Sequence, residues 1–182
     1  MTFEQIWAPW RLAYVQGPKE TLPSAAAHLR FLPEADPLCF LCQAAVDGGS
    51  PERHVVHVGP HTVTMLNRYP YNNGHLLVAP RRHVARLDQL TPEEQIEMLE
   101  QISQMINHLE TAIHPHGFNV GLNLGQAAGA GLPSHLHWHI VPRWTGDTNF
   151  MPVLANLNVI PQSLDAIWEA LRGLIEKPEG GK

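Results

Sequence analysis

Three histidines alternate with apolar residues in the run His135-Leu136-His137-Trp138-His139. Successive side chains of a β-strand point to opposite faces. A strand here would therefore place the three imidazoles on one face, and Leu136, Trp138 and Ile140 on the other, toward the core. Imidazole titrates near neutral pH, so a neutral ring can act as a nucleophile while a protonated neighbour donates hydrogen bonds to phosphate. The alternatives are an exposed polar strand face that happens to be rich in histidine, or an adventitious metal-binding patch. The strict alternation, preceded by a glycine-rich turn, favours a catalytic site.

The two cysteines, Cys39 and Cys42, have the spacing of many zinc ligands and also of redox pairs. The chain begins Met1-Thr2-Phe3-Glu4-Gln5, without the basic and apolar regions of a signal peptide. We therefore predict a cytoplasmic protein, in which a structural disulfide is disfavoured. A closed zinc site needs two further ligands, and two free thiols remain the alternative.

Composition limits the classes of partner. The 182 residues suffice for one domain with a hydrophobic core. The formal net charge of -5 argues against a protein that coats nucleic acid, because such proteins need an excess of lysine and arginine. No apolar run approaches the ~18 residues that span a bilayer, so no membrane partner is expected. A small anionic ligand is compatible with these properties, because it needs only a local cluster of donors.

The elements that must position these residues follow an α+β order with a mainly antiparallel sheet. Short strands are predicted at residues 54–58, 62–66, 75–79, 118–124 and 135–141, with turn signals between most of them. Residues 1–38 are expected to form an irregular arm packed on the body, and residues 39–182 a single domain.

Two helices are predicted. The first begins after Thr91-Pro92-Glu93-Glu94, where Thr91 and Glu94 can form a capping box. The second runs from Ser163 to about Gly173. Apolar residues at three- and four-residue spacing predict the buried stripe of the first helix, and these are Ile96, Leu99, Ile102, Ile106, Leu109 and Ile113.

The heptad from His135 to Val141 resembles the signature of the histidine-triad family. The resemblance extends over roughly residues 39–145 by strand and turn order. It includes Asn67, the pair Gly74-His75 with its apolar strand, and the Pro80-Arg81-Arg82-His83 turn. The tail at residues 142–150 and the Trp-Ala-Pro-Trp-Arg arm resemble in particular the bacterial diadenosine tetraphosphate phosphorylases.

This resemblance implies a histidine-triad fold: a five-stranded, mainly antiparallel sheet with one long helix and a C-terminal helix, paired as a homodimer or tetramer. It implies a nucleotidyltransferase that cleaves dinucleoside polyphosphates of the diadenosine tetraphosphate type, with phosphate as the acceptor. His137 matches the nucleophile that forms a nucleotidyl-imidazole intermediate. His139 matches a donor to the α-phosphate oxygens or to the leaving oxygen.

Other positions are candidates for nucleotide binding. His75 matches an active-site histidine beside the triad, although a lone strand histidine is as often structural. Asn67 and Asn123 are candidates for hydrogen bonds to sugar or phosphate, although asparagine near a turn is often structural. Backbone amides of residues 125–131 could face phosphate. Many family members carry a side-chain donor where this chain has Gly131, and Ser134 is its candidate substitute. Trp144 could stack on a base or belong to the core or an interface.

The resemblance also implies structural zinc bound by Cys39, Cys42, His83 and His135, and no organic cofactor. Three alternatives to a phosphorylase remain. The first is a hydrolase of nucleoside phosphoramidates or dinucleoside polyphosphates, with water as acceptor. The second is a hexose-1-phosphate uridylyltransferase, whose motif ends in glutamine where this chain has His139. The third is a non-catalytic module that binds nucleotide or metal.

Overall fold

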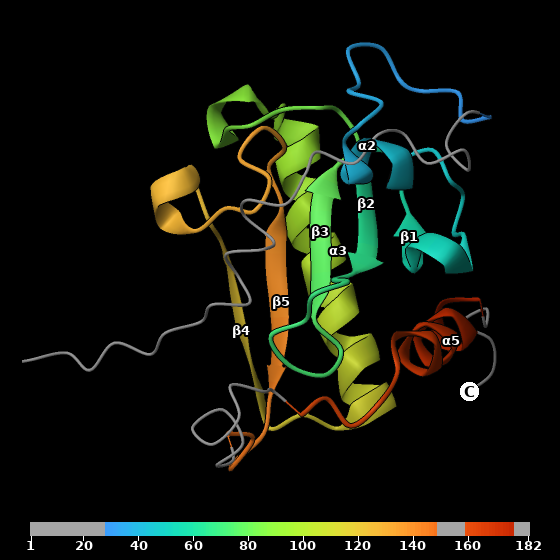
Figure 1. Cartoon of the computed structure of the whole chain (residues 1–182), viewed down its shortest axis with the longest axis vertical. Coiled ribbons are helices and arrows are strands. Elements are labelled where there is room, and N and C mark those ends of the chain that lie inside the picture. Colours follow the sequence, from blue (N-terminus) through green and yellow to red (C-terminus); the bar gives the residue numbers. More distant parts are fainter. Residues whose placement is uncertain (1–27, 149–158, 177–182) are drawn as a thin grey trace, which may run out of the picture.

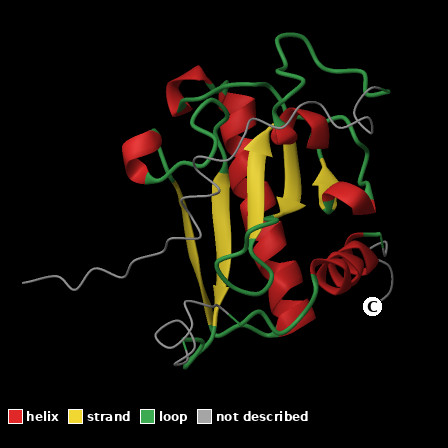
Figure 2. Cartoon of the chain, in the orientation of Figure 1, coloured by secondary structure: helices red, strands yellow, loops and turns green. Residues whose placement is uncertain are grey.

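The computed structural model describes residues 28–148 and 159–176. Its centre is a five-stranded sheet in the order β1-β2-β3-β5-β4, in which every neighbouring pair is antiparallel (Figures 1 and 2). The strands are β1 (Val55–Val58), β2 (Thr62–Leu66), β3 (Leu76–Pro80), β4 (Gly117–Leu122) and β5 (Trp138–Arg143). The predicted α+β class and mainly antiparallel sheet are confirmed. Most of the predicted arm at residues 1–38 lies outside the described residues, so the predicted division of the chain stays a prediction.

Three α-helices surround the sheet in the described part of the chain: α2 (Phe40–Ala44), α3 (Pro92–Ile113) and α5 (Leu164–Ile175). The long helix α3 runs behind the sheet in Figure 1, with α5 near its C-terminal half. Ser163 caps α5, as its Oγ accepts a hydrogen bond from the N–H of Ala166. Among the described helices none has the length and apolarity to cross a membrane.

The start of α3 agrees with its sequence signal. The Thr91 hydroxyl accepts a hydrogen bond from the N–H of Glu94, and the Glu94 carboxylate accepts one from the N–H of Thr91. Pro92 stands at the first helical position, where a missing N–H costs nothing. The capping box is therefore confirmed.

The buried stripe of α3 differs from the prediction. The side chains that face the sheet include Met98, Ile102, Met105 and Leu109, at spacings of four, three and four residues. Ile96 and Leu99 are 59% and 60% exposed, so assigning them to the core was wrong. In the first turns of α3, the helical period fits the predicted residues and the observed buried residues equally well. The buried set is completed by two methionines, Met98 and Met105, whose side chains are flexible enough to fill irregular gaps.

Alternate residues of the strands pack into two separate cores. On β3, Leu76 and Val78 contact the core under α3, whereas Leu77 and Ala79 contact the core beside α2. The second core also contains Cys39 and the other apolar residues of the α2 segment. The sheet is therefore covered by α3 on one face, and its other face near α2 carries the cysteines.

Strand β5 begins later than predicted, at Trp138 and not at His135. It pairs with β3 only from Leu76 to Val78. Further along β3 stands Pro80, which has no N–H to donate to a ladder, and the N–H of Leu136 donates instead to the carbonyl of Val84 at 2.6 Å. His135 and His137 thus lie in the segment that leads into β5, and His139 lies on the strand itself.

Candidate functional site

His137 is held in one tautomer by its own backbone neighbourhood. Its Nδ1 lies 2.8 Å from the carbonyl oxygen of His135. A carbonyl can only accept, so Nδ1 carries the proton and Nε2 of the neutral ring has the free electron pair. The side chain is buried, and burial lowers the pKa of His137, which favours the neutral ring. Within the site this imidazole has the properties of a nucleophile.

His75 and His139 form a hydrogen-bonded pair of imidazoles beside His137. The N–H of Tyr71 donates to Nδ1 of His75 at 3.0 Å, and Nε2 of His75 lies 2.9 Å from Nδ1 of His139. In the neutral His75 ring the proton is therefore on Nε2 and is donated to His139. His139 in turn carries its proton on Nε2 when it is neutral. Its ring centroid lies 5.1 Å from that of His137.

Burial explains why His75 is neutral. The side chain is 1% exposed, and this burial, reinforced by the nearby His139 and His137, lowers the pKa of His75 to about 3. His75 can thus remain a hydrogen-bond donor to His139 throughout the physiological pH range. This hydrogen bond attaches His75 to the fold and also orients the His139 ring of the triad, and a direct role of His75 toward substrate stays a prediction.

The loop before β3 supplies Asn67 and Tyr71. The Asn67 Oδ1 accepts a hydrogen bond from the N–H of Tyr69 at 2.9 Å, and its Nδ2 lies 3.3 Å from Nδ1 of His75. The Tyr71 ring lies over His75 and His139, with centroid distances of 4.7 Å and 5.8 Å. Asn67 thus lies next to the histidines, and its predicted hydrogen bond to sugar or phosphate stays a prediction. Tyr71 was not predicted.

A cavity of about 500 Å³ opens beside His139, a size that suits a small organic ligand. It is lined by residues 119–123 along β4, by alternate residues of β5, by Tyr71 and Asn72, and by residues 147–148 and 159–160. Of the residues predicted from sequence, His139 and Asn123 line it. His137 and His75 are buried and do not line it, and Gly131, Ser134 and Trp144 are also absent from its walls.

The glycine-rich segment folds back before the triad. Gly125 and Gly129 have φ values of 81° and 87°, which favour glycine, and a 3₁₀ turn spans Gln126–Ala128. Gly131 and Ser134 are exposed, and neither donates a hydrogen bond to any residue within 28–148 or 159–176. Their donors are therefore available to a ligand near His135. Their contact with phosphate stays a prediction.

Trp144 lies at the end of β5. Its indole N–H donates to the carbonyl of His114, the residue that caps the C-terminus of α3, at 3.1 Å. This contact gives the indole a structural attachment, and the predicted stacking on a base stays a prediction.

Four side chains, one of them the first histidine of the run, converge into a cluster that could hold a metal ion. Cys39, Cys42, His83 and His135 each offer one ligand atom, and these atoms all lie within 4.8 Å of one another. The shortest separations are 3.2 Å from Cys42 Sγ to His83 Nδ1 and 3.3 Å from Cys39 Sγ to His135 Nδ1. These four residues were predicted together, and the fold brings them together from three distant parts of the chain.

The tautomer of His135 suits metal ligation. Its Nε2 donates to the carbonyl of Pro80 at 2.9 Å, which leaves the Nδ1 electron pair directed at the two sulfur atoms. A hydrogen bond between the two cysteine side chains lowers the pKa of the Cys42 thiol to about 4. The same hydrogen bond, together with burial, raises the pKa of the Cys39 thiol. The pair thus already favours one thiolate.

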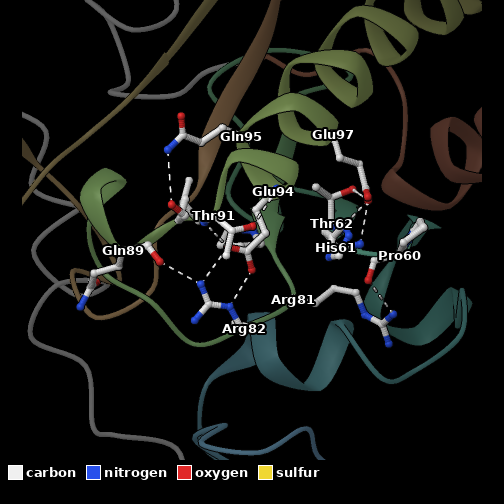
Figure 3. Close-up of polar contacts among 12 residues, drawn as sticks. Pro60, His61, Thr62, Arg81, Arg82, Gln89, Thr91, Glu94, Gln95 and Glu97 are labelled. Carbon is white, nitrogen blue, oxygen red and sulfur yellow. Dashed lines mark hydrogen bonds and ion pairs between the residues drawn. The ribbon is translucent and has the colours of Figure 1, made fainter.

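Polar networks fix the segment that carries His83 (Figure 3). The Arg82 guanidinium binds both carboxylate oxygens of the buried Glu94 at 2.6 and 2.7 Å, and donates to the carbonyl of Gln89 at 2.8 Å. Glu94 belongs to the α3 capping box, so the turn after β3 is tied to the start of α3. Next to it, Glu97 accepts hydrogen bonds from the N–H groups of His61 and Thr62.

Sequence reasoning also missed a charged group at the far end of the cavity. The Arg143 guanidinium makes two hydrogen bonds to Asp147, at 2.6 and 2.9 Å, and one to Asn119 Oδ1 at 2.7 Å. A usable signal was present, because Arg143 is four residues after His139 on one strand and shares its face.

Comparison with known proteins gives three kinds of match: a family model, relatives in sequence and a solved structure. The model of the HIT domain family matches residues 49–146. The chain is 40% identical over 162 residues to AP-4-A phosphorylase of Mycobacterium tuberculosis (strain CDC 1551 / Oshkosh), covering 88% of this chain and 78% of that one. It is 34% identical over 86 residues to the asymmetrical bis(5'-nucleosyl)-tetraphosphatase of Schizosaccharomyces pombe, covering 47% of each. A Zn-bound histidine triad family protein from Mycobacterium smegmatis has the same fold, with a TM-score of 0.56, 24% identity and coverage of 70% of this chain and 86% of that one.

Proposed function

The chain belongs to the HIT domain family, and from that membership we propose that it is a nucleotidyltransferase that cleaves dinucleoside polyphosphates of the diadenosine tetraphosphate type and transfers the nucleotidyl group to phosphate. The observation that carries the proposal is the hydrogen bond from His137 Nδ1 to the His135 carbonyl, which leaves Nε2 free to attack. The similarity to AP-4-A phosphorylase over most of both chains supports the choice of substrate class.

The first chemical step forms a covalent intermediate. The Nε2 electron pair of His137 attacks the α-phosphorus of one nucleotide, and the bond from phosphorus to the bridging oxygen breaks. With diadenosine tetraphosphate this leaves AMP on His137 and releases ATP. The bridging oxygen leaves with the electron pair, and the N–H of His139 can donate a hydrogen bond to it as its charge develops.

The second step discharges the intermediate. An oxygen of inorganic phosphate attacks the same phosphorus, the P–N bond breaks, and the electron pair returns to His137. The products are ADP and the free enzyme, so the sum is diadenosine tetraphosphate plus phosphate giving ADP plus ATP. His137 ends in the state in which it began, because Nδ1 keeps its proton on the His135 carbonyl throughout.

The second candidate uses water in place of phosphate. The similarity to an asymmetrical bis(5'-nucleosyl)-tetraphosphatase supports this hydrolase as the second candidate. Hydrolysis of diadenosine tetraphosphate by this route gives AMP and ATP. The decisive assay incubates the purified protein with diadenosine tetraphosphate with and without phosphate. Phosphate-dependent ADP supports the phosphorylase, and AMP in both reactions contradicts it.

The nucleophile is tested separately. The variant His137→Asn should lose turnover and fail to become adenylylated, while it still binds diadenosine tetraphosphate. His108→Asn, on α3 and outside the site, is the matched control and should retain turnover. Full turnover by His137→Asn would overturn the mechanism with either acceptor, and it would also favour a non-catalytic role for the histidine run.

We further propose that the cluster of Cys39, Cys42, His83 and His135 binds structural zinc. Zinc–ligand bonds of about 2.0 to 2.3 Å in a tetrahedron place donor atoms about 3.3 to 3.8 Å apart, and three separations here are 3.2, 3.3 and 3.5 Å. Two sulfur and two nitrogen donors are a common zinc set, and zinc would link the α2 segment to the triad. Elemental analysis of the purified protein should return one zinc per chain, and Cys42→Ser should abolish it.

We also propose a homo-oligomer, as the family resemblance implies. Strand β4 ends the sheet, and Val120 on it is 42% exposed. An edge strand with exposed apolar residues is suited to pairing with a second copy. Light scattering should give a mass of two or four chains, and a monomer would contradict the proposal.

A further inference from the structure

The cavity beside His139 extends along strand β5 to a guanidinium group. His139, Val141 and Arg143 alternate on one face of β5 and all line it. Four residues of strand span about 13 Å, so Arg143 lies well beyond the reacting phosphorus. On the neighbouring strand, Gly121 pairs with His139 and Asn119 pairs with Val141. Because Gly121 has no side chain, the wall next to His139 is open.

The Arg143 side chain is held in place by hydrogen bonds that engage only part of its N–H groups. Asp147 and Asn119 accept three of its five N–H groups, and within the described residues the other two have no partner. The side chain is 46% exposed, and it is fixed by a bidentate ion pair, so it offers a pre-oriented donor at low entropic cost.

The carboxylate of Asp147 is not offered to the cavity in the same way. Its side chain is only 10% exposed. Besides Arg143, its Oδ2 accepts hydrogen bonds from Asn72 Nδ2 at 2.9 Å and from the N–H of Trp144 at 3.2 Å. Asp147 also lines the cavity, but its carboxylate is already engaged by these donors. What the ion pair, neutral as a whole, still offers to an anion is therefore the remaining N–H groups of Arg143.

The direction of the leaving group follows from the positions of the two triad histidines. His139 lines the cavity, whereas the nucleophile His137 is buried and is not among the lining residues. A phosphorus atom attacked by His137 expels its leaving oxygen on the opposite side. A leaving oxygen that receives a hydrogen bond from His139 then emerges into the cavity, and the remaining phosphates extend along β5.

We propose that Arg143 binds the polyphosphate of the leaving group, with Asp147 and Asn119 as the residues that position it. This rests on the proposed function and assigns it a specificity: the site selects substrates whose leaving group carries several phosphates over substrates with a small uncharged one. Arg143 makes no contact with the reacting phosphorus. Its effect is on binding and departure of the polyphosphate chain.

The test compares two substrates of one active site. Diadenosine tetraphosphate has a polyphosphate leaving group, and adenosine 5'-phosphoramidate has none. Charge-assisted hydrogen bonds predict that Arg143→Gln lowers kcat/KM for the tetraphosphate about 10- to 100-fold while leaving the phosphoramidate within about twofold. Arg143→Lys should recover part of the loss. Arg86→Gln removes an exposed guanidinium that is also paired with an aspartate, and should change neither value.

The outcomes separate this inference from the proposed function. Equal loss on both substrates means a structural role for Arg143, and no loss on either means no role; both overturn the inference. If wild type cleaves neither substrate, the proposed function fails, and binding decides the inference instead. Calorimetry with inorganic tripolyphosphate should then show binding to wild type and weaker binding, by 10-fold or more, to Arg143→Gln. Equal affinity of the two proteins would overturn the inference.

Discussion

Replacing His75 by glutamine should change how the stability of the protein depends on pH. In the folded protein, burial holds the pKa of His75 at about 3, whereas its ordinary value is 6.5. Protonation is therefore favoured in the unfolded chain. The stability contributed by the neutral ring is fully present above pH 6.5, and it is lost progressively as the pH falls toward 3. The variant His75→Gln cannot titrate there, and its amide can still donate to His139.

The size of the effect follows from the two pKa values. The full difference corresponds to about 5 kcal/mol, of which about 2 kcal/mol is lost between pH 8 and pH 5. For a chain of this length, 1 kcal/mol shifts Tm by about 2 to 4 °C, so wild type should lose about 4 to 8 °C over this range through His75 alone. The side chain is 1% exposed, so solvent screening reduces this value little.

The assay is urea unfolding of both proteins at pH 8 and pH 5. Titrating groups that do not interact with His75, including the cysteines of the metal cluster, are common to both, so their contributions cancel in the difference between the proteins. Wild type is expected to be the more stable at pH 8, by an amount that shrinks by about 2 kcal/mol at pH 5. Parallel profiles, or an NMR titration of the His75 ring with a midpoint near its ordinary value, would refute the reasoning.

Three further predictions concern the framework of the site. Chelation or Cys42→Ser should lower Tm by about 8 to 16 °C if free zinc is about 1,000 times its Kd, because that binding contributes about 4 kcal/mol; calorimetry with and without chelator measures it. Gly74→Ala should destabilise by about 1 to 3 kcal/mol, since φ is +71° and the added Cβ would lie 2.7 Å from a methyl group of Ile113. Gly48→Ala, with φ +65° and open space, should lose less in the same urea titration. Glu94→Gln should cost about 1 to 2 kcal/mol and weaken zinc retention, whereas the exposed Asp88→Asn should change both little.

The fold was predictable wherever local chemistry and tertiary packing agree. Thr91 and Glu94 specify the start of α3 by hydrogen bonds between residues three positions apart. The strands were found because their apolar residues are compact and bounded by turns. Ile96 and Leu99 were misplaced because helical period alone does not say which stripe faces the sheet. That choice is made by packing against strands distant in sequence.

Strand β5 shows a different limit. The alternation of histidines predicts a strand from His135, but a strand exists only where a neighbour can supply hydrogen bonds. Pro80 on β3 cannot, so the first two histidines lie ahead of the ladder. The four residues of the metal cluster were predicted together because the family resemblance assigned His83 and His135 to the same site as the two cysteines. Spacing along the chain alone does not connect them. Tyr71 carries no local signal, since only the folded loop brings its ring over two imidazoles.

The three alternating histidines also show how one backbone serves two sites. His135 directs its imidazole to the cysteines, and its carbonyl accepts the proton of the His137 ring. Substituting the imidazole leaves that carbonyl in the chain, so the metal cluster can affect the nucleophile only by holding the peptide group in position. Likewise the alternation that pairs His137 with His139 places Arg143 on the cavity wall four residues later. In the proposed mechanism, the metal ligand, the nucleophile, the leaving-group donor and the polyphosphate donor thus follow one another in chain order along a single segment.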